Sequence, residues 1–210
     1  MHITVVPASP RTAQATIRHL LVDASAPTVR GVYRDLSRVP DEFKTSPRFE
    51  AVQGDIENAA SLDFSGSDAI FMVQPPVYDE RDSVEYTKTV SENVKVAIRK
   101  ATSIKKLVHL SSVGAQYDHG TVSYARGVHV EVRTDMSKGE ILTNHTSEVV
   151  LRDAASEVVF VRASYFMENW VSSIATVTKE SFLYTSVTPV DFAWPHVGCP
   201  AVHFEVQPPS

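Results

Sequence analysis

The sequence of 210 residues contains a single cysteine, Cys199. One cysteine cannot form an intrachain disulfide, and it excludes a cysteine cluster around zinc. No apolar stretch approaches the roughly 20 residues that a membrane-spanning helix needs. The first residues show the pattern of a strand and lack the apolar segment of a signal peptide. We therefore expect a cytoplasmic protein with no membrane partner.

The chain also lacks a run of lysine and arginine that would form a basic stripe. Its net charge is −5 and its pI is about 5.9. Because binding of nucleic acid depends on neutralising phosphates, this balance argues against a direct nucleic-acid partner. The composition, 43% hydrophobic and 21% charged, is typical of a globular protein with a substantial core.

Short apolar segments alternate with amphipathic segments along most of the chain. A long helix is predicted from the spacing of apolar residues between Tyr86 and Ala101, and another over residues 141–155. Strand–helix alternation with short connections is typical of a parallel sheet covered on both faces. We predict an α/β fold, a Rossmann-like doubly wound parallel sheet. The predicted strands are residues 3–6, 28–34, 49–53, 69–73, 107–110 and 158–161.

Glycine is absent from the turn that follows the first predicted strand. In dinucleotide-binding folds this turn carries three glycines, which allow a sharp turn, close approach of the pyrophosphate and close helix packing. The corresponding residues here are Pro7, Pro10 and Ala13. Ala13 still permits close packing, but each proline lacks an N–H and leaves fewer donors for a phosphate. The residues expected to contact a cofactor at this turn are Pro7, Ala8, Ser9, Arg11 and Thr12.

The ends of the second and third strands supply further candidate cofactor residues. Arg34 lies just past the second strand, where an acidic residue would bind a ribose 2′-hydroxyl and an arginine instead suits a 2′-phosphate. This position favours NADP over NAD, and the alternative is a solvated surface arginine. Asp55 follows the third strand, where it can meet an adenine edge or simply form a turn.

The fourth predicted strand ends in Val73, Gln74 and Pro75. Open α/β sheets bind ligands at the carboxyl ends of their strands, so we assign these three residues to the cofactor site. The alternative is a loop stiffened by proline. At the end of the fifth strand, Ser111 is assigned to the cofactor. Ser112 is a catalytic candidate that can orient a substrate carbonyl or the nicotinamide, or else caps the strand end.

A tyrosine followed four residues later by a lysine is also missing. In dehydrogenases of this type the lysine lowers the pKa of the tyrosine, which then transfers a proton. None of the seven tyrosines has a lysine at that spacing. The usual proton relay is therefore absent.

The second catalytic candidate is His145, three residues before Glu148 on a predicted helix, so that both share a face. His145 can act as a general acid with Glu148 orienting it, or the two can form a surface pair. Tyr165 and Phe166 follow the sixth strand and are assigned to the substrate, although Phe166 can equally belong to an apolar core. No metal site is expected, because the histidines lack ligand spacing.

Several segments occur in an order and spacing known from one family. They are residues 3–9 leading into 15–18, residues 32–35, 54–55 and 109–115, the helix around Glu148, and residues 161–169. On these segments the chain resembles the NmrA-like branch of the atypical short-chain dehydrogenases/reductases, particularly its fungal, averufin oxidase-like members. The tyrosine and lysine positions of the family fall on Glu140 and Asn144. The resemblance covers most of residues 1–195.

The resemblance implies an NAD(P)-binding Rossmann domain over residues 1–195, followed in the family by a smaller C-terminal substrate region. Compared with the family, residues 122–138 look inserted, although a surface hairpin is the simpler interpretation. Residues 196–210 are expected to form an irregular tail. We expect a truncated substrate region, as in a shortened or mis-spliced product.

Three interpretations remain open once the resemblance is taken into account. The leading interpretation is an NADP-dependent oxidoreductase acting on an aromatic or quinone-type intermediate of fungal secondary metabolism. One alternative is a non-catalytic NAD(P)-binding redox sensor that regulates a transcription factor and has a protein partner. The other is a truncated product without activity. The missing tyrosine–lysine pair favours the sensor, whereas a loop poor in phosphate donors disfavours both binding interpretations, and the sensor more.

Overall fold

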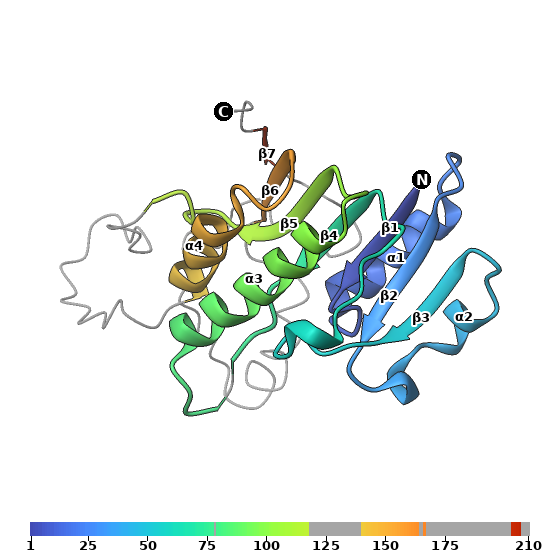
Figure 1. Cartoon of the computed structure of the whole chain (residues 1–210), viewed down its shortest axis with the longest axis horizontal. Helices are drawn as coiled ribbons and strands as arrows, with labels where there is room; N and C mark the ends of the chain where they lie inside the picture. Colours follow the sequence, from blue (N-terminus) through green and yellow to red (C-terminus); the bar gives the residue numbers. More distant parts are fainter. Residues whose placement is uncertain (78, 118–139, 164–165, 167–202, 207–210) are drawn as a thin grey trace, which may run out of the picture.

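The computed structural model describes residues 1–77, 79–117, 140–163, 166 and 203–206. In this part of the chain a seven-stranded sheet runs through the centre of the molecule in the order β3-β2-β1-β4-β5-β6-β7 (Figure 1). The strands are β1 (His2–Val6), β2 (Thr28–Tyr33), β3 (Phe49–Gln53), β4 (Ala69–Val73), β5 (Lys106–Ser112), β6 (Glu157–Ala163) and β7 (His203–Val206). The helices are α1 (Arg11–Val22), α2 (Asp41–Lys44), α3 (Ser83–Lys100) and α4 (Glu140–Leu151). The predicted Rossmann-like α/β fold is confirmed.

Strands β1 to β6 are parallel, and β1 lies between β2 and β4. In register, Val5 of β1 stands opposite Gly31 of β2 and Phe71 of β4. After β1 the chain builds β2 and β3 on one side of β1, and it then crosses to the other side of β1 to form β4. Open sheets have a crevice at this switch point, outside the carboxyl ends of the strands.

The C-terminal segment differs from the prediction. Residues 196–210 were expected to be irregular, but His203–Val206 form β7, which pairs antiparallel with β6. An uncovered β6 would present a row of unpaired N–H and C=O groups, and a short antiparallel strand satisfies them. The prediction is therefore wrong for these four residues. The rest of that segment, and the expected insert over 122–138, lie outside the described residues.

The ends of several elements also differ from their predictions. The predicted helix over 141–155 ends at Leu151, and a turn follows in which the Ala154 N–H donates to the Leu151 carbonyl. The chain turns early because β6 begins at Glu157, whose N–H donates to the carbonyl of Lys105 at 2.9 Å. Strand β2 ends at Tyr33, so that Arg34 lies beyond the sheet.

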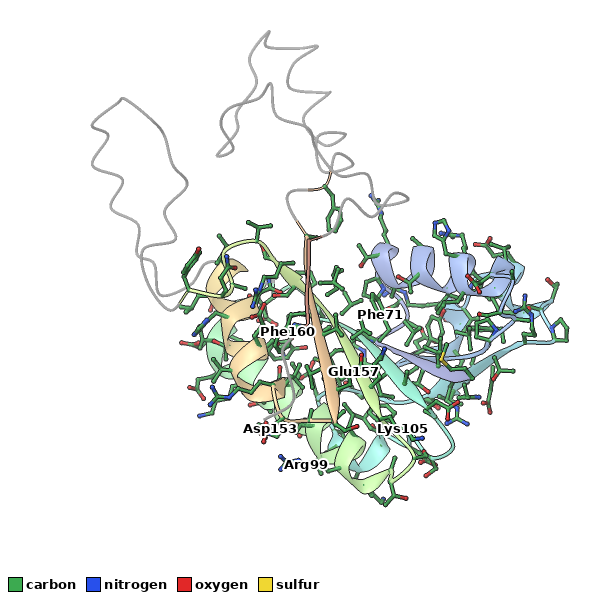
Figure 2. The ribbon with its side chains drawn as sticks, turned by 90° about the horizontal axis from the view of Figure 1, so that it is seen from above. Phe71, Arg99, Lys105, Asp153, Glu157 and Phe160 are labelled. Carbon is green, nitrogen blue, oxygen red and sulfur yellow. The ribbon has the colours of Figure 1, made fainter. Side chains whose placement is uncertain are left out.

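Helices cover both faces of the sheet and enclose two apolar cores. Figure 2 shows Phe160 of β6 on the side of α3 and α4, and Phe71 of β4 on the side of α1. The first core is packed by the apolar stripe of α3, with Val90, Val94 and Ala97 on its buried face. Residue spacing thus predicted the face of α3 that the structure buries.

A histidine is fully buried in the first core. His109 of β5 lies edge-on to the ring of Phe160, with 6.2 Å between the ring centroids. Neither ring nitrogen has a hydrogen-bond partner among the described residues. Burial lowers the pKa of His109 from 6.5 to about 4. The native protein therefore keeps this ring neutral at pH values where an unfolded chain protonates it.

We expect His109→Leu to reduce the acid sensitivity of the fold. The folded pKa of His109 lies below the unfolded value, so its stabilising contribution is complete above pH 6.5 and is lost as the pH falls toward 4. Between pH 7 and pH 5 the wild type should lose about 2 kcal/mol more unfolding free energy than the variant. Urea unfolding at both pH values measures this difference. An equal loss in both proteins would contradict the assignment.

Candidate functional site

A cavity of about 570 Å³ opens at the carboxyl edge of the sheet, beside the ends of β1, β2, β3 and β4. This is the crevice expected at the switch point between β1 and β4. Five of the predicted cofactor residues line the cavity, namely Pro7, Ser9, Arg34, Asp55 and Pro75. The other lining residues are Pro10, Tyr33, Asp35, Arg38, Gly54, Ile56, Glu57, Pro76, Val77, Asp79, Arg81 and Tyr86.

The turn after β1 leads directly into α1. Ala8 is fully buried, and its N–H donates to the Val32 carbonyl at 2.8 Å, so this residue anchors the turn rather than facing the cavity. Helix α1 follows Pro10, which provides no side-chain cap, and its first turn contains no acidic residue. Arg11 and Thr12 occupy that first turn, where backbone N–H groups have no partner within the helix. The N-terminus of α1 thus suits an anion, although the prolines supply no N–H donors.

The loop after β3 is held in a tight turn. The Gly54 N–H donates to the Tyr33 carbonyl at 2.9 Å, and a Cβ at Gly54 would lie only 2.8 Å from the Val32 side chain. The Asp55 carboxylate accepts the N–H of Glu57 at 2.9 Å. This arrangement points the loop toward the cavity and fixes the backbone of Glu57.

A cluster of charged side chains forms one wall of the cavity. The Glu57 carboxylate lies 3.0 Å from Arg81 Nη1 and 4.0 Å from Arg34 Nη1, and it accepts the Tyr86 hydroxyl at 3.3 Å. The guanidinium of Arg81 lies over the Tyr86 ring, 4.6 Å from its centroid, and contacts Asp79 at 2.6 Å. Hydrogen bonding to Asp79 raises the pKa of Arg81, and burial raises the pKa of Tyr86 to about 12. We refer to Arg34, Glu57, Arg81 and Tyr86 as the arginine cluster.

Sequence reasoning identified Arg34 in this cluster but missed Glu57, Arg81 and Tyr86. Their position next to the ends of elements was the only signal. Glu57 follows Asp55 by two residues, and Arg81 directly precedes the N-cap of α3. No motif marks them. Their contacts join positions 24 and 29 residues apart, which no local pattern predicts.

The three residues at the end of β4 have different surroundings. Val73 is buried in the core on the α1 side, whereas Pro75 lines the cavity. The Gln74 amide nitrogen donates to Thr87 at 3.2 Å, and its oxygen accepts the Ser147 hydroxyl at 3.0 Å. The Gln74 side chain therefore ties the end of β4 to α3 and α4.

The two serines at the end of β5 also have different surroundings. Ser111 is buried and donates to Glu148 Oε1 at 2.6 Å. Arg162 of β6 donates to the same carboxylate from Nε at 3.0 Å and from Nη2 at 2.8 Å. The Ser112 hydroxyl lies 3.4 Å from the Val113 carbonyl, a long contact that leaves it able to turn toward a ligand.

His145 does not pair with Glu148. The carboxylate is turned toward Ser111 and Arg162, and His145 Nδ1 lies 2.8 Å from the Ala115 carbonyl. The prediction that Glu148 orients His145 is therefore wrong, because the buried arginine of β6 takes both carboxylate oxygens. A carbonyl partner makes Nδ1 the donor, so that the neutral ring has Nε2 as an acceptor.

The substrate assignments fall at the edge of the described chain. Phe166 is half-buried, and Tyr165 lies outside the described residues. Asn144, at the lysine position of the resembled family, is buried in α4. Among the described residues no group of histidine, cysteine, aspartate and glutamate side chains has a metal-binding arrangement. In the same residues, no helix combines the length and apolar character needed to cross a membrane.

A family model described as NAD(P)H-binding matches residues 8–193. The chain belongs to this NAD(P)H-binding family. The predicted cofactor class, NADP with NAD as the alternative, is confirmed at the level of NAD(P)H. No curated protein is significantly similar to the chain in sequence.

Several solved structures share the fold of this chain. An NADPH-dependent quinone oxidoreductase from Escherichia coli, complexed with NADPH, is 15% identical with a TM-score of 0.62, over 86% of this chain and 55% of the other. Triphenylmethane reductase from Citrobacter sp., complexed with NADP(H), is 18% identical with a TM-score of 0.60, over 85% and 55%. Gre2 from Candida albicans, in complex with NADPH, is 14% identical with a TM-score of 0.63, over 79% and 58%. The chain thus spans little more than half the length of these proteins.

The carboxylate of Glu148 should be essential for stability. Glu148→Leu leaves the buried Arg162 without its carboxylate, and we expect a loss of about 3–5 kcal/mol of unfolding free energy. The matched control is Glu157→Gln, which breaks an exposed pair with Lys106 and should change the same quantity by less than about 0.5 kcal/mol. Urea unfolding compares the two variants. Similar losses in both would refute the role given to the buried pair.

Proposed function

We propose that the chain is an NADP-dependent oxidoreductase that transfers hydride between NADPH and a small aromatic or quinone-type molecule. The observation that carries this proposal is the cavity at the switch point of the sheet, with Arg34 at its wall. The resemblance to fungal averufin oxidase-like proteins extends the proposal to an intermediate of secondary metabolism, in the cytoplasm. The similar structures that are named as quinone and triphenylmethane reductases support the same substrate class.

The residues around the cavity fit the adenosine half of NADP. Arg34 offers a guanidinium at the end of β2, where a 2′-phosphate requires a cation. Ile56, Pro75 and the ring of Tyr86 give the cavity apolar surface suited to a base. The pyrophosphate would be held at the first turn of α1, by Arg11, Thr12 and the N–H groups of that turn.

The chemical end of the site would lie beside β5. Bound NADPH supplies the hydride. We assign to Ser112 a hydrogen bond to the substrate carbonyl, which stabilises negative charge on its oxygen during reduction. We assign to His145 the role of general acid, which would donate a proton from Nε2 to the substrate oxygen. Ser111, by contrast, serves the structure through its bond to Glu148.

A redox sensor without turnover is the second candidate function, with another protein as its partner. The observation that favours it is Asn144, which is buried where the family has a lysine. An uncharged amide cannot lower the pKa of a tyrosine as a lysine does. A sensor would bind dinucleotide as proposed above but would not oxidise NADPH with any quinone.

The cofactor assignment predicts that NADPH stabilises the protein more than NADH does. A ligand that binds only the native state adds RT ln(1 + [L]/Kd), about 2.7 kcal/mol at a hundredfold excess over Kd. Arg34→Ala should strongly reduce the difference between NADPH and NADH in thermal unfolding. The control is Arg18→Ala, which removes an exposed arginine that pairs with Glu42 outside the cavity. If the folded wild type is stabilised by neither dinucleotide, the proposed function fails.

The catalytic assignment predicts a turnover defect without a binding defect. Ser112→Ala should lower kcat for quinone-dependent NADPH oxidation by about 10²-fold, with NADPH affinity unchanged. Ser103→Ala is the control, since Ser103 donates to the Ser67 carbonyl away from the cavity. Unchanged kcat in Ser112→Ala would rule out its role. A wild type that binds NADPH but never oxidises it would support the sensor instead.

A further inference from the structure

The arginine cluster places a carboxylate between two guanidinium groups on the wall of the cavity. Glu57 reaches Arg81 at 3.0 Å and Arg34 at 4.0 Å, and all three side chains are partly exposed to solvent. They come from three different segments, after β2, after β3 and before α3. The Glu57 carboxylate is therefore shared between the two arginines.

Arg81 is held in place by contacts that do not depend on Glu57. Its Nε lies 2.9 and 2.8 Å from the two oxygens of Asp79, and its Nη2 lies 2.6 Å from Asp79 Oδ2. The guanidinium also lies over the ring of Tyr86. These contacts leave Nη1 as the nitrogen turned toward Glu57. Removal of the Glu57 carboxylate would therefore leave Arg81 in position to bind another anion.

The other acidic groups of the cavity wall are already engaged with backbone donors or with the Arg81 side chain. Asp35 accepts the N–H of Ser37 at 2.9 Å, and Asp55 accepts the N–H of Glu57 at 2.9 Å. Asp79 accepts Arg81, which it anchors. Glu57 is thus the acidic group of the described wall whose oxygens contact both arginines and can be replaced by a ligand phosphate.

We propose that Arg81 is a second guanidinium for the 2′-phosphate and that Glu57 is the internal anion which this phosphate displaces. Glu57 then sets the selectivity between the two cofactors. A phosphate must compete with its negative charge, whereas a neutral ribose 2′-hydroxyl can donate a hydrogen bond to it. This inference rests on the proposed binding of NADP and names two residues that decide its specificity.

The inference predicts opposite effects of two substitutions on NADPH binding. Glu57→Gln keeps the shape of the side chain and removes its charge, so NADPH affinity should rise about tenfold while NADH affinity stays the same or falls. Arg81→Met keeps an unbranched apolar side chain at this position and removes the charge, so NADPH affinity should fall about tenfold with NADH changed less than twofold. Calorimetric titration of the full chain with each dinucleotide measures both.

A matched control is Glu50→Gln, which removes an exposed carboxylate that pairs with Arg30 outside the cavity. It should leave both affinities unchanged. If the wild type prefers NADPH through Arg34 but Glu57→Gln and Arg81→Met keep the wild-type ratio, this inference is overturned and the proposed function stands. If the folded wild type binds neither dinucleotide, both are overturned.

Discussion

The placement of β1 between β2 and β4 is the constraint on which the site depends. Parallel pairing on both sides brings the ends of these strands, and of β3 beside β2, to one edge of the sheet. Connections run away from that edge in opposite directions, which opens the crevice that the cavity occupies. The segments that carry Arg34, Glu57 and Arg81 are far apart in sequence and meet only because of this pairing.

Buried polar contacts give that edge a rigid support. Glu148 joins α4 to Ser111 of β5 and Arg162 of β6, and Gln74 joins β4 to α3 and α4. Because such groups are costly to leave without partners in a core, each restricts how the elements can move. Helix α4, where the resemblance would place a tyrosine and a lysine at positions 140 and 144, contributes the buried Asn144 and the network around Glu148. Any catalysis therefore has to rely on other donors, such as Ser112.

The doubly wound parallel sheet and the buried face of α3 followed from the sequence, because apolar runs and helical spacing report burial directly. The crevice followed as well, and with it Arg34, Asp55 and Pro75, since strand ends in such a sheet share one edge. The partner of Glu148 could not be predicted, because Arg162 lies on a different element and helix spacing pointed to His145. Glu57 and Arg81 were missed for the same reason. Strand β7 was missed because it exists only through its pairing with β6.

The most direct test of the account is the affinity of the wild-type chain for adenosine 2′,5′-bisphosphate compared with adenosine 5′-phosphate, measured by calorimetry. These probes contain only the adenosine half, so the result does not depend on the nicotinamide end or on turnover. The account predicts clearly tighter binding of the bisphosphate, with the advantage shrinking as salt is raised because exposed charges supply it. Equal affinity for the two probes, or no binding of either, would contradict the assignment of this cavity.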